Sequence, residues 1–210
     1  MRLFSVSRTF ITLFAATIAL TACGDKPLSA RLQSLVSSDK IAFQNTDITG
    51  IDYAKDFALT DHNGKARTLA DFKGKAVVVF FGYTQCPDVC PTTMAEMASV
   101  MQELGPLSDR VQVLFVTIDP ERDTQALLAQ YVPAFDPRFL GMFGDKAATE
   151  KIAKDFRIFY QKVPGKEPGI YTMDHTAGSY VFDPQGRIRL FIRHGQGAAP
   201  IVSDLKLLLQ

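Results

Sequence analysis

The run Ala76-Val77-Val78-Val79-Phe80-Phe81 constrains the fold of this chain more than any other segment. It follows Lys73-Gly74-Lys75 and holds six apolar residues in a row, so no alternate position is left to face water. A strand of this kind is buried on both faces, as in the parallel sheets of α/β proteins. The segment 111–118 is a second, largely apolar strand that ends at Asp119-Pro120. We therefore expect a buried central sheet covered by helices.

The segments around these two strands complete an α/β pattern. A helix over about 90–104 joins them, which gives a β-α-β unit with parallel strands. Asn63-Gly64 between the short apolar runs 57–60 and 66–69 predicts an N-terminal β-hairpin. Further helices are expected at 124–131, 146–156 and 202–209, and strands at 179–182 and 187–192. This order predicts a thioredoxin-like fold, a central mixed sheet flanked by helices.

Residues 1–22 have the layout of a secretory signal. Arg2 and Arg8 precede the apolar run 10–20, which is too short to span a bilayer. The run ends in Leu20-Thr21-Ala22-Cys23, which resembles a bacterial lipobox, where the cysteine is acylated and the signal peptide is removed before it. An uncleaved anchor and an unmodified Cys23 are the alternatives.

Three segments follow from this: a lipoprotein signal peptide at 1–22, a lipidated tether at 23–50 and a single domain at 51–210. The tether is polar and has little periodic apolar pattern. Lipid on Cys23 would hold an exported protein on a bacterial membrane, facing the periplasm. Lys plus Arg number 23 against 22 Asp plus Glu, and no run of five basic residues occurs. Nucleic-acid binding is therefore not expected.

With Cys23 assigned to lipid, Cys86 and Cys90 are the two remaining thiols, in a compartment where disulfides persist. They lie where a buried strand gives way to a helix, and a helix N-terminus stabilises a thiolate. Helical spacing puts their Cα atoms about 6 Å apart, which suits a disulfide or one shared soft metal ion. Pro87 and Pro91 follow them directly and should hold the cysteine backbones outside the helical region. A purely structural disulfide is the alternative, although so short a loop stabilises little.

A third ligand must come from elsewhere, and the chain has three histidines. His62 lies in the hairpin turn and His194 follows a strand, and both are expected to be solvated. His175 lies in a loop before the strand 179–182, and in a thioredoxin-like fold that loop faces the cysteines. Cys86, Cys90 and His175 form a two-sulfur, one-nitrogen set that suits copper or zinc.

These motifs resemble a known family. The run 81–91, which includes Gly-Tyr-Thr-x-Cys-Pro-Asp-Val-Cys-Pro, is similar to the signature of the Sco/SenC copper chaperones for cytochrome c oxidase assembly. The run 119–124 is similar to the family's Asp-Pro-x-Arg-Asp-Thr, and Asp174-His175 to its Asp-His-Ser, with Thr176 here in place of serine. The resemblance covers about 57–209.

The resemblance implies that Cys86, Cys90 and His175 bind copper, as Cu(I) or Cu(II), at about one ion per chain. It also implies that the copper passes to the binuclear copper site of an oxidase subunit. The alternative is a thiol-disulfide oxidoreductase that uses Cys86 and Cys90 to reduce the copper-ligand cysteines of the oxidase. Only copper delivery needs His175. We expect a monomer without a conventional enzyme active site.

Several neighbouring residues have two interpretations. Asp88 and Asp174 either orient a ligand or cap a turn. Asp123 is expected to cap the helix that runs to Tyr131. Three methionines recur at helical spacing after the cysteines, and they are interpreted as core residues rather than copper ligands: Met94, Met97 and Met101.

Overall fold

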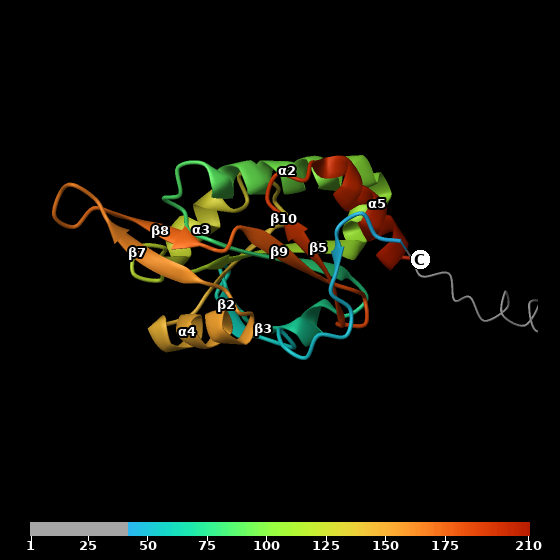
Figure 1. Ribbon diagram of the computed structural model, residues 1–210, viewed down its shortest axis with the longest axis horizontal. Helices are drawn as coiled ribbons and strands as arrows, with labels where there is room; N and C mark the ends of the chain where they lie inside the picture. The colour runs from blue at the N-terminus through green and yellow to red at the C-terminus, as the bar shows by residue number, and fades with distance from the viewer. Residues whose placement is uncertain (1–41) are drawn as a thin grey trace, which may run out of the picture. The chain divides into compact units, whose positions relative to one another are not determined.

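The computed structural model describes residues 42–210, so the predicted signal peptide and the acylation of Cys23 lie outside the described residues. An eight-stranded mixed sheet forms the centre, in the order β1-β10-β9-β4-β5-β6-β2-β3 (Figure 1). Strands β4, β5 and β6 are parallel to one another, and the other pairings are antiparallel. The strands are β1 (Thr46–Asp47), β2 (Ala58–Asp61), β3 (Ala66–Thr68), β4 (Ala76–Gly82), β5 (Val111–Thr117), β6 (Leu140–Phe143), β9 (Gly178–Phe182) and β10 (Ile188–Arg193).

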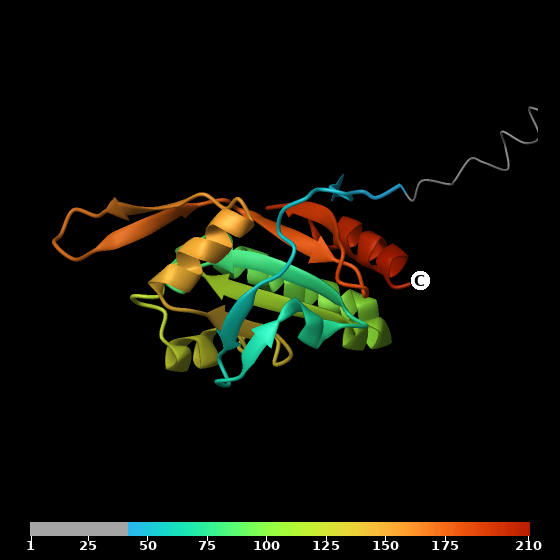
Figure 2. The same cartoon turned by 90° about the horizontal axis from the view of Figure 1, so that it is seen from below.

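Strands β4 and β5 are the buried centre of the sheet, and every residue in both is buried, as the apolar runs predict. Helices α2 (Val89–Leu104) and α5 (Ala198–Leu208) lie side by side over one face, and α4 (Lys146–Asp155) covers the other (Figures 1 and 2). Helix α3 (Gln125–Tyr131) packs against β6, and two short 3₁₀ helices, η1 (Leu69–Phe72) and η2 (Gly105–Arg110), complete the core. The predicted thioredoxin-like arrangement is confirmed.

A second sheet was not expected from the sequence. Strands β7 (Tyr160–Pro164) and β8 (Tyr171–His175) form an antiparallel hairpin that projects from the body (Figures 1 and 2). The prediction of a loop at His175 is therefore wrong, because His175 is the last residue of β8. The β7 positions after Tyr160 are exposed, so the segment lacks the apolar pattern that marks a buried strand.

The chain joins the sheet before residue 51, where the domain was expected to start. Strand β1 pairs with Phe191 and Leu190 of β10. Just before it, the backbone N–H groups of Gln44 and Asn45 each donate to the buried Asp204 carboxylate of α5 at 2.8 Å. Within residues 42–210, none of the helices has the length and apolar character needed to cross a bilayer.

His62 is buried, so the expectation that it is solvated is wrong. The predicted hairpin of β2 and β3 does form, but β2 also pairs with β6, which covers the turn. The His62 backbone N–H donates to the Gly141 carbonyl at 2.8 Å, and its Nδ1 accepts the Gly141 N–H at 3.0 Å. A turn motif carries no information about the strand that later packs beside it.

Candidate metal site

The two cysteines lie where the central strand passes into a helix. Strand β4 ends at Gly82, and α2 begins at Val89, so Cys86 precedes the helix and Cys90 lies in its first turn. The Cys90 backbone N–H donates to Cys86 Sγ at 3.4 Å, which is the helix N-terminal stabilisation of sulfur that the sequence predicts. Cys90 is helical despite Pro91, contrary to expectation, because a proline in the first turn gives up no helical hydrogen bond.

His175 completes the cluster from the end of β8. Its Nε2 lies 3.6 Å from Cys90 Sγ. The ligand atoms of Cys86, Cys90 and His175 all lie within 4.8 Å of one another, and both thiols are free. The structure thus brings together the three residues that the sequence predicts as a site.

The tautomer of His175 leaves the correct nitrogen available. Its Nδ1 lies 3.1 Å from the Thr176 carbonyl oxygen, which can only accept, so Nδ1 carries the proton. Nε2 then presents a lone pair toward the two sulfurs, as a metal ligand must. Burial lowers the pKa of His175, although the Thr176 carbonyl and the charge of Asp174 act in the opposite direction. The neutral imidazole is therefore the favoured form near neutral pH.

The two sulfurs differ in how far they are exposed to solvent. Cys90 is completely buried, and this burial raises the pKa of its thiol. A bound metal cation supplies the positive charge that a thiolate at this position lacks. Cys86 is half-buried and lines a pocket of about 300 Å³. The other residues around the pocket are Tyr83, Pro87, Asp88, Val89, Thr172, Met173, Asp174, His175 and Ala177. Cys86 is thus the sulfur that is accessible from the pocket.

Gly82 and Tyr83 shape the site, and sequence reasoning assigned them no role. A Cβ at Gly82 would lie 2.9 Å from Cys90 Sγ, so only glycine leaves room for that sulfur. The ring of Tyr83 packs edge-on against the His175 imidazole, with 6.0 Å between centroids. A glycine at the end of an apolar strand is a signal of close approach, and this signal could have identified Gly82.

Arg122 links the cysteine loop to the hairpin that carries His175. Its guanidinium bonds to the Asp119 carboxylate at 2.5 Å, to Gln85 Oε1 at 3.0 Å and to the Tyr171 carbonyl at 2.8 Å. The same group stacks 3.5 Å from the centroid of the Tyr171 ring, whose hydroxyl donates to Asp119 at 2.8 Å. The motif at 119–124 therefore fixes the distance between the two halves of the site.

Asp123 is not a helix cap, contrary to expectation. Thr124 caps α3 by accepting the Leu127 N–H, whereas the buried Asp123 carboxylate faces the other way. It accepts from the backbone N–H and the hydroxyl of Thr84 and from the hydroxyl of Thr117. Asp123 thus holds the start of the cysteine loop against the end of β5.

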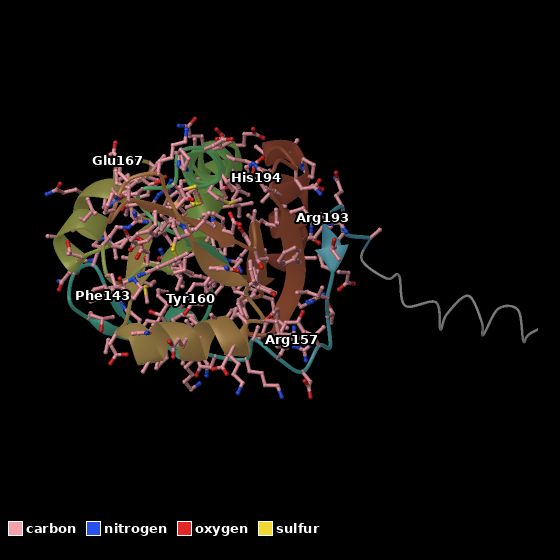
Figure 3. The ribbon with its side chains drawn as sticks, turned by 60° about the vertical axis from the view of Figure 1, so that its left-hand side comes forward. Phe143, Arg157, Tyr160, Glu167, Arg193 and His194 are labelled. Atoms are coloured by element: carbon pink, nitrogen blue, oxygen red, sulfur yellow. The ribbon has the colours of Figure 1, made fainter. Side chains whose placement is uncertain are left out.

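Asp88 and Asp174 are both exposed. Asp88 is the N-cap residue of α2 and accepts from the Thr92 hydroxyl at 3.4 Å, while Asp174 acts on His175 through its charge. Their role in orienting a ligand stays a prediction. His194 is exposed, as expected (Figure 3). Its Nδ1 lies 3.0 Å from Thr93 Oγ1. The three methionines of α2 are core residues, as interpreted from the sequence: Met94, Met97 and Met101.

Comparison with known proteins gives the family. The model of the SCO1/SenC family matches residues 45–210. The chain belongs to this family. A mitochondrial SCO2 homolog from Bos taurus is 37% identical over 153 residues, which are 72% of this chain and 58% of the relative. The matched region therefore spans less than two thirds of that relative's length.

Two solved structures of Sco proteins are close in both sequence and fold. Bradyrhizobium japonicum ScoI with copper bound is 44% identical, with a TM-score of 0.68, and the match covers 73% of this chain and 98% of that one. Apo Sco1 from Thermus thermophilus is 40% identical, with a TM-score of 0.71, over 80% and 98% of the two chains. The sequence-based prediction of the Sco/SenC family is confirmed.

Proposed function

We propose that this protein is a copper-binding metallochaperone in which Cys86, Cys90 and His175 hold the metal. The observation that carries the proposal is the convergence of their ligand atoms within 4.8 Å of one another. The copper-bound structure of a 44% identical Sco protein supports the choice of copper over zinc.

The donor set fits copper in two oxidation states. Two thiolates are soft ligands that satisfy Cu(I), and the unprotonated Nε2 of His175 adds the imidazole nitrogen that Cu(II) prefers. Cys86 is accessible from the pocket while Cys90 is enclosed. Ligand exchange with a partner would therefore begin at the Cys86 side of the site.

The proposed recipient is the binuclear copper site of a cytochrome c oxidase subunit, and the proposed place of action is the periplasmic side of a bacterial membrane. Family membership supports the recipient, and the lipobox at Cys23 supports the membrane tether. Changing Cys23 to Ala should release the protein from the membrane fraction or leave an uncleaved precursor, with the copper site unchanged. A mature Cys23→Ala protein that still sediments with membranes would exclude lipid anchoring at this residue.

Copper titration of the reduced protein tests the proposal. We expect about one copper per chain and, for Cu(II), a sulfur-to-copper charge-transfer band, because thiolate is the strong donor in this loop. Changing Cys86 or Cys90 to Ser should abolish the band. A Cys90→Ser protein with unchanged band and affinity would show that the ligands are misassigned.

One observation favours a second function, thiol-disulfide exchange. The reachable Cys86 sulfur accepts a helix N-terminal N–H, and the buried Cys90 lies behind it as a resolving thiol. In this reaction the dithiol would become a disulfide as a substrate disulfide becomes two thiols. If the protein acts by thiol-disulfide exchange, the cysteine variants should lose the reduction of the substrate disulfide. The His175→Ala variant should keep full reductase activity.

A further inference from the structure

The projecting β7–β8 hairpin carries exposed apolar side chains. Phe159, Val163 and Ile170 are 57%, 37% and 56% exposed. Within residues 42–210, the one other large apolar side chain that is exposed is Leu107, which lies on η2. We name Phe159, Val163 and Ile170 the hairpin strip. The hairpin thus carries three of the four exposed large apolar side chains in residues 42–210, which points to it as a contact surface.

The strand register puts the hairpin strip on one face. Val163 pairs with Thr172, and because side chains alternate along a strand, odd positions of β7 share a face with even positions of β8. Phe159 continues the ladder through its carbonyl, which accepts the Thr176 N–H. Ile170 lies opposite Gly165, whose N–H donates to the Ile170 carbonyl at 2.7 Å.

The opposite face of the hairpin packs on the body and carries the metal ligand. Tyr171, Met173 and His175 share that face, where Tyr171 stacks under Arg122 and Met173 is buried. Lys162, on the same face, pairs with Glu121 at 2.5 Å. An isolated two-stranded hairpin is marginally stable, so these contacts are what hold the strip in a fixed position relative to His175.

The outward face of the hairpin, which carries the strip, also borders the metal pocket. Thr172 and Asp174 belong to the outward face and also line the pocket that contains Cys86 and His175. Asp88 and Asp174 are exposed carboxylates at this pocket, and no lysine or arginine is among its lining residues. Figure 3 looks toward the hairpin, with Tyr160 labelled at its base and Glu167 in the connection at its tip.

We propose that the hairpin strip and the two carboxylates, Asp88 and Asp174, form the docking surface for the proposed copper recipient, the copper-site domain of an oxidase subunit. The partner would present basic side chains beside its own copper ligands and an apolar patch over Phe159, Val163 and Ile170. The proposal rests on the proposed function. A symmetric pair of copies is disfavoured, because it would place the same carboxylates of both chains at one interface.

The test uses the reduced, copper-loaded protein and the purified metal-free copper-site domain of the oxidase subunit from the same organism. Phe159→Ser and Ile170→Ser should each weaken binding about tenfold, as truncation of a buried interface anchor does. Leu107→Ser is the matched control and should bind the domain as the unchanged protein does. Copper affinity should be the same in all three variants, because none of the three substituted side chains lines the metal pocket. The association rate should fall as salt rises from about 20 to about 200 mM.

Three results would overturn the proposal. A Phe159→Ser, Ile170→Ser double variant that binds the domain and transfers copper at the unchanged rate would exclude the surface while leaving copper delivery intact. Failure of the unchanged, copper-loaded protein to bind the domain or transfer copper to it would exclude this recipient, and the docking proposal with it. A concentration-dependent dimer that the double variant converts to monomer would identify a second copy as the occupant.

Discussion

Cys90 Sγ lies 3.6 Å from His175 Nε2, although the two residues are 85 positions apart in the chain. One comes from the first turn of α2 and the other from the end of a projecting hairpin. Neither element fixes this distance alone. The geometry of the metal site therefore depends on the packing that joins the cysteine loop to the hairpin.

Gly82→Ala should crowd the buried sulfur of Cys90 and so distort the metal site. The added Cβ would lie 2.9 Å from Cys90 Sγ and 2.9 Å from the Phe115 ring, and neither atom lies at the end of a freely moving side chain. We expect a loss of about 1–3 kcal/mol in the free energy of unfolding and a weaker copper complex, measured by urea unfolding and copper titration.

Gly144→Ala is the matched control for Gly82→Ala. Its added Cβ would lie 2.7 Å from the Ala148 Cβ, so it is equally crowded, but it adjoins α4 rather than a metal ligand. It should lose stability without losing copper affinity per folded molecule. Equal copper affinities in the two variants would show that Gly82 serves packing alone.

Arg122→Gln should loosen the connection between the cysteine loop and the hairpin. The variant loses the ion pair with the buried Asp119 and the contacts with Gln85 and Tyr171. We expect a loss of about 2–3 kcal/mol in stability and a fall in copper affinity, measured on the same samples.

Arg138→Gln provides the comparison, because Arg138 also pairs with an aspartate, Asp136, and bonds to Ser108 away from the site. Its copper affinity should match that of the unchanged protein. Unchanged copper affinity in Arg122→Gln as well would mean that the ligands hold their positions without this arginine.

Acid should destabilise the metal-free protein through His62. Burial lowers the pKa of His62 below its ordinary value of 6.5, with the Asp61 charge acting in the opposite direction. Below pH 6.5 the unfolded chain therefore binds a proton at this residue that the folded chain does not. The contribution to stability is complete above 6.5 and is lost as pH falls from 6.5 toward the lower folded-state pKa.

Urea unfolding of the metal-free protein between about pH 7.5 and about pH 5.5 measures this effect. The pKa of His175 is also lowered by burial, so the unchanged protein has two such contributions. In His62→Gln the free energy of unfolding should fall less steeply with falling pH than in the unchanged protein, because the contribution of His175 alone remains. A slope identical to that of the unchanged protein would show that His62 is protonated equally in both states.

The buried part of the fold was predictable from the sequence because its signals are local. Residues 76–81 and 111–118 are continuous apolar runs, and Asn63-Gly64 marks a hairpin turn. The cysteine pair was predictable because both thiols lie at one strand-to-helix junction, where a site is expected.

The hairpin that carries His175 was not predictable in the same way. The positions of β7 after Tyr160 face solvent, and the hairpin is stabilised by Arg122 and Tyr171 rather than by an apolar core of its own. Burial of His62 depends likewise on β6, about 80 residues later in the chain. Contacts over such separations leave no periodic pattern in the residues that make them.

The proposed function requires that the working form of the protein holds copper at Cys86, Cys90 and His175. The most direct test is cytochrome c oxidase activity in copper-limited cells whose only copy carries His175→Ala, with His194→Ala as the control for loss of an exposed imidazole. We predict that oxidase activity fails in His175→Ala and is normal in His194→Ala. Full oxidase activity in His175→Ala under copper limitation would contradict it and favour thiol-disulfide exchange by the cysteines alone.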